Sequence, residues 1–245
     1  MWALGMPCVP FELEDNPQLY DFTSAKGFAL AVALCLSLRA GGFLLAAPVC
    51  SSWVWLNRGT SLRCEFCPLG MGPNTQMANG MVSKLAVLLR IVSPLQALWV
   101  FEQPAGSLMQ LHPRMQDIFK CMQVYRSSWR MSDFGGATQK PTWLYANRSL
   151  EGLAAHRDTR SRTASGSLVT KRRDTSGRLR VTGAGAVLKH SQHYPQGFGR
   201  ALASVYQAYI PDLLREEFVP PRLSEGALHD QWEDALIGDI ITSLS

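Results

Sequence analysis

Two residues of types that do chemistry stand just beyond apolar runs of the sequence: Cys50 and Glu102. A cysteine thiolate is a nucleophile that can add to an electrophilic carbon. Glu102 ends the run ALWVF, where a carboxylate would be nearly buried and would need a partner. The pair predicts a site that combines a thiol nucleophile with an acid. An ordinary buried cysteine explains Cys50 equally well, and a structural salt bridge or a helix cap would also explain Glu102.

The residues before Cys50 predict a helix followed by a buried strand. Thr23 or Ser24 can cap the helix, and the Gly41–Gly42 pair ends it. Its apolar positions have the i, i+3, i+4, i+7 spacing of one helical face and are Ala29, Val32, Ala33 and Leu36. The run GFLLAA (42–47) is continuously apolar and predicts a strand buried on both faces of a parallel sheet, which Pro48 ends.

The same order of helix and strand repeats before Glu102. Pro94 closes a second helix, whose apolar face is Leu85, Leu88, Leu89 and Val92. The run ALWVFE (97–102) is a second buried strand. Ligands of open α/β sheets bind beyond the carboxyl ends of the strands, so Cys50 and Glu102 are expected to face one crevice.

Further along, the sequence predicts a short helix at 113–122 and two strands, VYRSSWRM and TWLYAN, joined by a turn that contains glycine. A later helix has one apolar face, made of Leu202, Val205, Tyr206 and Tyr209, and the tail from Ser224 can form another helix. The predicted organisation is an N-terminal extension (1–20), an α/β core (21–150), a flexible basic insert (151–193) and a C-terminal helical segment (194–245).

The net charge of +5 comes from one segment. Residues 157–180 hold eight basic and two acidic residues, which makes this window +6 and the rest of the chain −1. Basic residues without aromatic neighbours favour phosphate over stacked bases, and those expected to contact phosphate are Lys171, Arg172, Arg173, Arg58 and Arg63. A solvated loop explains the basic window equally well.

Six cysteines in a chain of this size do not make a disulfide framework and fit a reducing compartment, the nucleus or the cytoplasm. Cys64 and Cys67 form a CxxC that lacks a second CxxC or a histidine pair, so we expect two loop thiols and no metal site. Arg39 and the glycine pair interrupt the apolar stretch at 27–49, so no membrane span is predicted.

Four strings occur in order along the chain: APVCSSW (47–53), VFEQPAGS (100–107), DFGGATQKPTWL (133–144) and HYPQGFGRAL (193–202). Together they resemble the cytosine-5 DNA methyltransferases, and in particular the divergent methyltransferase-like proteins of protist genomes. The resemblance covers roughly residues 20–150 and 190–210. It implies a Rossmann-like sheet of the S-adenosylmethionine-dependent methyltransferase type, with DNA as partner.

The resemblance also implies roles for individual residues. Cys50 would add to the 6-position of a cytosine flipped out of the duplex, and Glu102 would stabilise the charge at its N3 side. Lys140 stands where the family carries an arginine that holds the flipped nucleotide. S-adenosylmethionine would supply the methyl group, with Asp21 and Pro48 at the cofactor.

The sequence departs from the family pattern at several points. Val49 separates Pro48 from Cys50, Gln103 replaces an asparagine, and Thr142 stands where a second arginine is common. Before Gly27 the only glycine is Gly5, so the glycine-rich cofactor loop is absent and the sheet is expected to be incomplete on its N-terminal side. A truncated or degenerate family member fits this pattern. The alternatives are a catalytically silent nucleic-acid-binding module and a remnant of a mobile element.

Overall fold

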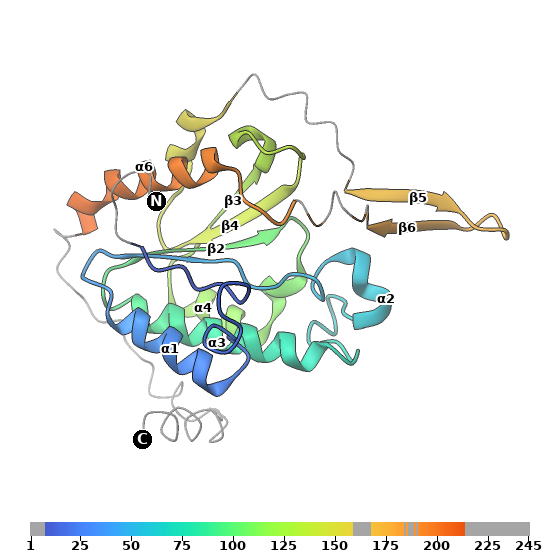
Figure 1. Ribbon diagram of the computed structural model, residues 1–245, viewed down its shortest axis with the longest axis horizontal. Helices are drawn as coiled ribbons and strands as arrows, with labels where there is room; N and C mark the ends of the chain where they lie inside the picture. Colours follow the sequence, from blue (N-terminus) through green and yellow to red (C-terminus); the bar gives the residue numbers. More distant parts are fainter. Residues whose placement is uncertain (1–7, 159–167, 184, 186–188, 190, 214–245) are drawn as a thin grey trace.

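The structure is a computed structural model of the 245-residue chain and describes residues 8–158, 168–183, 185, 189 and 191–213 (Figure 1). The helix predicted in the tail from Ser224 lies outside the described residues.

A mixed four-stranded sheet in the order β1-β2-β4-β3 forms the centre of the protein. Its strands are β1 (Phe43–Ala46), β2 (Leu98–Pro104), β4 (Pro141–Ala146) and β3 (Tyr125–Arg130). β1 is parallel to β2, as the repeated order of helix and strand predicts, whereas β4 is antiparallel to both of its neighbours. The architecture is α/β and is compatible with a Rossmann-like fold.

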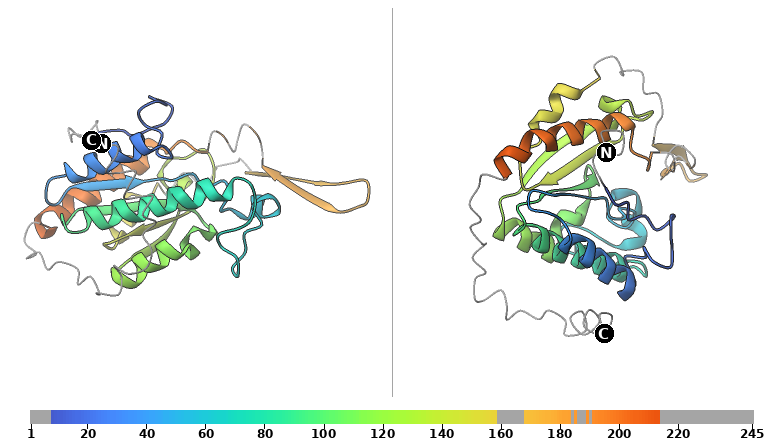
Figure 2. Two further views of the ribbon diagram at one scale, coloured as in Figure 1. Left: turned by 90° about the horizontal axis from the view of Figure 1, so that it is seen from below. Right: turned by 60° about the vertical axis from the view of Figure 1, so that its left-hand side comes forward.

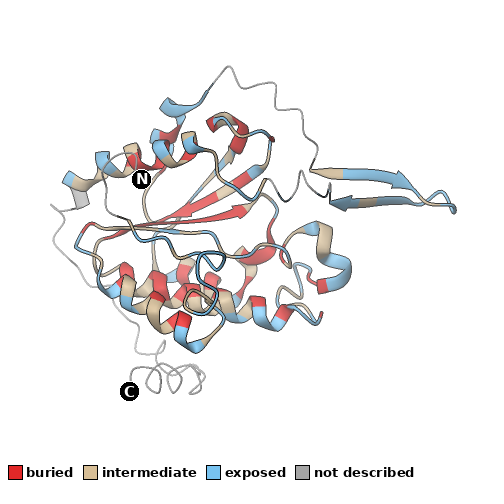
Figure 3. Ribbon diagram, viewed as in Figure 1, coloured by how far each residue is buried: buried red, intermediate tan, exposed pale blue. Residues whose placement is uncertain are grey.

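Helices cover both faces of the sheet and make three layers (Figures 1 and 2). One face carries α1 (Ala25–Leu36), α3 (Thr75–Val92) and α4 (Pro113–Cys121), and the other carries α6 (Gln196–Leu213). Side chains of β2 alternate between two cores. Trp99 and Phe101 pack with α1, α3 and α4, while Leu98 and Val100 pack with α6. β2 is therefore buried on both faces, as predicted (Figure 3).

β1 differs from the prediction for the run at 42–47. The segment is a strand, but it is not buried on both faces, and Leu45 is 36% exposed. Among the described residues β1 is an edge strand whose one strand neighbour is β2. The continuous apolar run therefore predicted the strand correctly. The prediction that both faces are buried was wrong, because burial depends on which elements cover the strand.

The N-cap of α1 was predicted correctly, whereas its end and its buried face were not. α1 ends at Leu36, with Ser37 as its C-cap, and not at the Gly41–Gly42 pair. Ser24 is the N-cap, and its hydroxyl accepts a hydrogen bond from the Gly27 N–H. The buried face consists of Phe28, Ala31 and Cys35, whereas Leu36 is 63% exposed. Both sets of residues have helical spacing. The larger Phe28 ring decides between them, because it packs edge-on against Phe22 with ring centroids 5.7 Å apart.

The other predicted elements of the body are confirmed. α3 buries the whole predicted face, and α4 and the β3–β4 hairpin fall at the predicted segments. In α6, Leu202 and Val205 are buried, and Tyr206 and Tyr209 pack partly buried against the same core. Short 3-10 turns connect the elements: η2 (Trp55–Asn57), η3 (Leu108–Leu111), η4 (Met131–Phe134) and η5 (Glu151–His156).

Part of the segment predicted as a flexible insert is a β-hairpin, β5 (Val169–Arg173) and β6 (Leu179–Gly183). The Asp174 carboxylate organises its turn by accepting hydrogen bonds from the backbone N–H groups of Ser176 and Arg178. The hairpin extends away from the body and is mostly exposed (Figures 2 and 3).

No helix among the described residues is long and apolar enough to cross a membrane.

Candidate active site

Glu102 is a buried carboxylate near the end of β2. It is 4% exposed and has the same strand parity as Leu98 and Val100, so its side chain lies on the face covered by α6. A charged group in this position needs compensating partners. Two residues from distant parts of the chain supply them.

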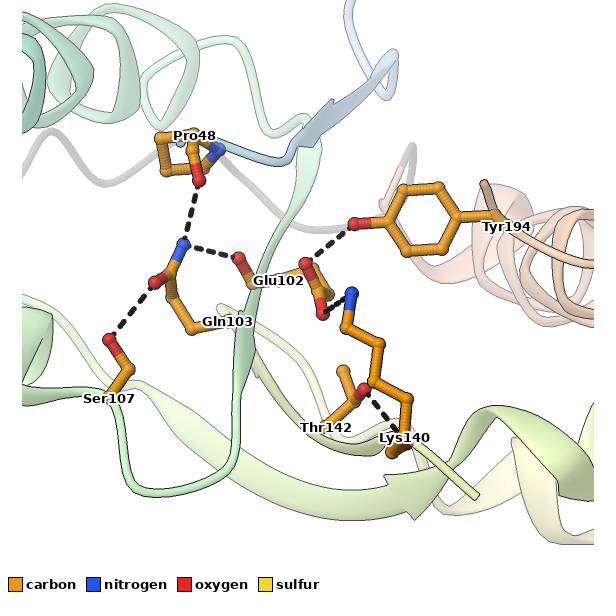
Figure 4. Close-up of polar contacts among 7 residues, drawn as sticks. All are labelled: Pro48, Glu102, Gln103, Ser107, Lys140, Thr142 and Tyr194. Atoms are coloured by element: carbon orange, nitrogen blue, oxygen red, sulfur yellow. Dashed lines mark hydrogen bonds and ion pairs between the residues drawn. The ribbon is translucent and has the colours of Figure 1, made fainter. Parts of the chain in front are cut away.

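Lys140 and Tyr194 take one carboxylate oxygen of Glu102 each (Figure 4). Lys140 Nζ lies 3.2 Å from Glu102 Oε1, and the Tyr194 hydroxyl donates to Glu102 Oε2 over 2.6 Å. The contact to Oε1 is an ion pair without a well-aligned hydrogen bond, so that oxygen retains an open acceptor direction. Burial and the adjacent negative charge of Glu102 raise the pKa of Tyr194, which keeps the phenol neutral and donating.

Cys50 belongs to the same group of side chains. Burial raises the pKa of the Cys50 thiol, the Lys140 charge opposes this shift, and the Glu102 charge adds to it. The half-buried thiol is two residues beyond Pro48, whose carbonyl is hydrogen-bonded to Gln103, the residue after Glu102, and the charges of both partners of the ion pair act on it. The structure brings together Cys50, Glu102 and Lys140, three residues that the sequence analysis placed in one site. Because the pKa of Cys50 is raised, its thiol is neutral at neutral pH.

Gln103 joins the segment that carries Cys50 to the end of β2. Its Nε2 donates to the carbonyl oxygens of Pro48 (3.0 Å) and Glu102 (2.8 Å), and its Oε1 accepts from the Ser107 hydroxyl (3.0 Å) (Figure 4). The side chain is 1% exposed. Gln103, which departs from the family pattern, therefore positions the start of the Cys50 segment beside β2.

Thr142 has a structural role next to Lys140. It is fully buried on β4, and its hydroxyl donates to the Lys140 carbonyl oxygen over 3.3 Å. This bond fixes the backbone from which the Lys140 side chain reaches Glu102 (Figure 4). A second arginine, which the family often carries here, would have to be accommodated inside the core.

Arg63 is not available to phosphate, contrary to the expectation from the sequence. It is 2% exposed, and its guanidinium carbon lies 3.4 Å from the centroid of the Trp53 ring. Its N–H groups donate to protein oxygens, namely the Pro68 and Thr75 carbonyls, Asn79 Oδ1 and Ser52 Oγ. A basic residue of a polar loop was expected at the surface, but the loop folds around this guanidinium.

The other basic candidates are exposed. Arg58 begins the short helix α2 (Arg58–Ser61), and Lys171, Arg172 and Arg173 are on β5. The hairpin strand β6 contacts η2, which lies a few residues beyond Cys50 (Figure 1). One strand of the hairpin is therefore near the segment that follows Cys50, while the hairpin itself extends away from the body.

The residues expected at the cofactor do not assemble a site among the described residues. Asp21 Oδ1 accepts from the backbone N–H (2.8 Å) and the hydroxyl (2.6 Å) of Thr23, and these bonds lower the pKa of Asp21. The Pro48 carbonyl accepts from Gln103. Both candidates serve contacts within the chain, so the described residues do not fit S-adenosylmethionine.

Two residues of the site were not assigned a role from the sequence: Tyr194 and Gln103. Tyr194 belongs to the string HYPQGFGRAL, which carries part of the resemblance, and precedes Pro195 close to the start of α6. A tyrosine beside a proline at a helix start is a weak signal by itself. Its partner is 92 positions away in sequence, and only the packing of α6 on the sheet joins the two.

Comparison with known proteins finds no match to this chain among family models, curated proteins or solved structures. Within the part of the chain that the structure describes, no group of three or more histidine, cysteine, aspartate or glutamate side chains could hold a metal ion.

Proposed function

We propose that this protein is a methyltransferase-like protein related to the DNA cytosine-5 methyltransferases, in which Cys50 adds covalently to a flipped cytosine. The observation that supports the proposal is that Cys50, Glu102 and Lys140 come together near the carboxyl end of β2. They come from three separate segments, which follow β1, lie on β2 and precede β4. Such a meeting is expected if the resemblance reflects a common chemistry.

The covalent step uses the thiol and the acid together. The sulfur of Cys50 forms a bond to C6 of the ring as the π electrons of the C5=C6 bond shift through C4 to N3, which takes up a proton that the Glu102 carboxylate relays from solvent. The thiol proton passes to solvent. The open acceptor direction at Glu102 Oε1 suits the exocyclic amino group of cytosine. Lys140 stabilises the thiolate that must form beforehand.

Tyr194 occupies the other oxygen of Glu102 and limits access to it. A base that hydrogen-bonds both carboxylate oxygens would have to displace the phenol. In the family, S-adenosylmethionine supplies the methyl group that C5 then receives. The described residues do not present a site for that cofactor, so the addition of Cys50 to C6 is the step that this chain's own residues support.

The addition step is tested by trapping. The full-length protein is incubated with duplex DNA carrying 5-azacytosine, whose ring is more electrophilic at C6, with and without S-adenosylmethionine. A covalent protein–DNA species is expected, and it should vanish in Cys50→Ser and persist in the matched control Cys121→Ser, which removes an exposed thiol of α4. No adduct, or an adduct that survives Cys50→Ser, would overturn the proposal. Calorimetry with S-adenosylmethionine separately measures whether the cofactor binds.

The exposed β5–β6 hairpin favours a second candidate, a nucleic-acid-binding module without catalysis. Arg172 on β5 lies directly opposite Arg180 on β6, and like charges in such a pair repel unless an anion lies between them or a neighbour compensates. Asp174 compensates Arg180 through an ion pair of 3.0 Å, whereas Arg172 has no ion pair with any described residue. A phosphate group of a nucleic acid would supply the missing negative charge next to Arg172.

A further inference from the structure

A two-residue turn holds Cys64 and Cys67 opposite each other. The Cys64 N–H donates to the Cys67 carbonyl and the Cys67 N–H donates to the Cys64 carbonyl, each over 3.2 Å. This reciprocal pattern is that of a hydrogen-bonded pair in an antiparallel ladder, whose Cα atoms lie about 5.5 Å apart. A disulfide spans Cα separations of roughly 4.4–6.8 Å, so the backbone already has the spacing that a disulfide between these residues requires.

Both thiols are free and within reach of solvent. Cys64 is exposed and Cys67 is half-buried. At the tip of the turn, Phe66 is 98% exposed, so the turn lies at the surface of the described protein. A small oxidant can therefore reach the exposed Cys64 directly, and Cys67 is only partly covered.

Arg63, the residue before Cys64, is an unusual neighbour for this pair. A buried guanidinium is normally paired with a carboxylate, because an isolated buried charge is costly. Here all of its hydrogen-bond acceptors are neutral oxygens, and no carboxylate of the described residues lies within ion-pair distance of it. Burial lowers the pKa of Arg63 to about 10, and the neighbouring Cys67 acts in the opposite direction. Arg63 therefore places a positive charge next to the cysteine pair, and no described carboxylate neutralises it.

We propose that Cys64 and Cys67 form a reversible disulfide by exchange with a small-molecule disulfide. One thiolate of the pair attacks one sulfur of the small disulfide, forms a mixed disulfide and expels one thiolate. The other thiolate of the pair then attacks the protein sulfur of the mixed disulfide and expels the second. Two protein thiols and one small disulfide are converted into one protein disulfide and two small thiols, and excess thiol reverses both steps.

The experiment uses glutathione disulfide and the full-length protein. After oxidation and blocking of free thiols, the intact mass is measured, and the chain is cleaved after Glu65 or Phe66, between the two cysteines. A Cys64–Cys67 disulfide lowers the mass by two hydrogen atoms and keeps the two cleavage fragments joined until a reductant is added. Cys8→Ser and Cys121→Ser, matched thiol removals outside the turn, should leave this result unchanged.

Two single variants trap the mixed disulfide. In Cys64→Ser the glutathione adduct should accumulate on Cys67, and in Cys67→Ser it should accumulate on Cys64, because the resolving thiol is gone in each. Fragments that separate without reductant, or glutathione adducts on both cysteines of the wild-type protein without an internal disulfide, would overturn the proposal. The outcome does not depend on whether the chain methylates DNA.

Discussion

The Tyr194 hydroxyl donates a 2.6 Å hydrogen bond to Glu102 Oε2 and thereby joins the start of α6 to the central strand of the sheet. The tyrosine ring also packs near Phe198, with ring centroids 5.5 Å apart, and Lys140 Nζ lies 5.4 Å from its centroid. The acid of the candidate site is therefore held between two layers of the protein. Its hydrogen bonding contributes to stability as well as to any chemistry.

Tyr194→Phe should lower the free energy of unfolding by about 1.5–3 kcal/mol, the range for hydrogen bonds to charged groups. Urea denaturation measures the loss. Tyr206→Phe is the matched control, since Tyr206 donates to a neutral acceptor, the Gly41 carbonyl, over 2.8 Å, and its removal should cost about 1 kcal/mol. Equal losses in the two variants would mean that the Glu102 charge does not strengthen the Tyr194 bond. The phenylalanine variant should also form the 5-azacytosine adduct faster, because the carboxylate is less occupied.

The ion pair between Glu102 and Lys140 predicts a strong non-additivity. Each side chain is largely buried, 5% and 12% exposed, so Glu102→Gln or Lys140→Met alone leaves a buried charge unpaired and should cost about 3 kcal/mol. The double variant removes both charges and should be more stable than the sum of the single effects by about 2 kcal/mol. The measurement is a double-mutant cycle in urea. Simple addition of the two effects would show that the residues do not interact in solution.

Helices and strands with large apolar side chains at regular spacing could be predicted from the sequence. Which of their residues are buried could not always be predicted. The face of α3 carries four large aliphatic residues and has one solution. In α1, alanines occupy several faces, so the position of Phe28 decided the rotation. A continuous apolar run such as 42–47 is compatible with a central strand or an edge strand, and only the order of strands in the sheet distinguishes them.

The candidate site likewise combines features that the sequence predicts with others that it does not. A carboxylate at the end of an apolar strand signals a buried group that needs partners, and this prediction for Glu102 is confirmed. The sequence does not reveal that a phenol from the start of α6 is one of them. Arg63 shows the opposite error: it belongs to a segment rich in glycine, proline, arginine and serine, which predicts an exposed loop, but Trp53 and α3 enclose it. Such contacts between distant segments leave no local pattern in the sequence.

The reactivity of Cys50 should respond in opposite directions to its two charged neighbours. Glu102 raises the pKa of the thiol and Lys140 lowers it, so Glu102→Gln should accelerate alkylation by iodoacetamide at fixed pH, and Lys140→Met should slow it. Mass spectrometry of the Cys50 peptide between pH 7 and 9 gives the rates, with the exposed Cys121 as internal reference. A change of the same sign in both variants would indicate altered access to the thiol and would contradict the electrostatic account.

His112 predicts a loss of stability in mild acid. Burial is the main reason that its pKa falls from 6.5 to about 4, with Arg63 and Arg114 adding to the shift. Because the folded-state pKa is depressed, the unfolded chain binds the proton more readily between pH 6.5 and 4. The neutral imidazole therefore contributes stability that is present above pH 6.5 and lost as the pH falls toward 4, by about 3 kcal/mol.

The variant His112→Asn isolates this effect. His112 is the N-cap of α4, where its Nδ1 accepts from the Arg114 N–H over 3.2 Å, and asparagine can make the same cap without titrating. Free energies of unfolding measured from pH 4 to 7 should fall less steeply for the variant than for the wild-type protein. Parallel curves would show that His112 is not the group responsible.

The basic hairpin predicts salt-dependent binding to DNA. Each phosphate contact contributes about 0.9 to the slope of the logarithm of the binding constant against the logarithm of the salt concentration, so replacing Lys171, Arg172 and Arg173 by glutamine should reduce the slope by about 2.7. Fluorescence anisotropy with a labelled duplex at several salt concentrations gives the slope. The matched control replaces three exposed basic residues outside the hairpin, Lys26, Arg39 and Lys120, and changes the net charge equally. If both triple variants lose the same slope, binding depends on overall charge, and the hairpin has no special part in it.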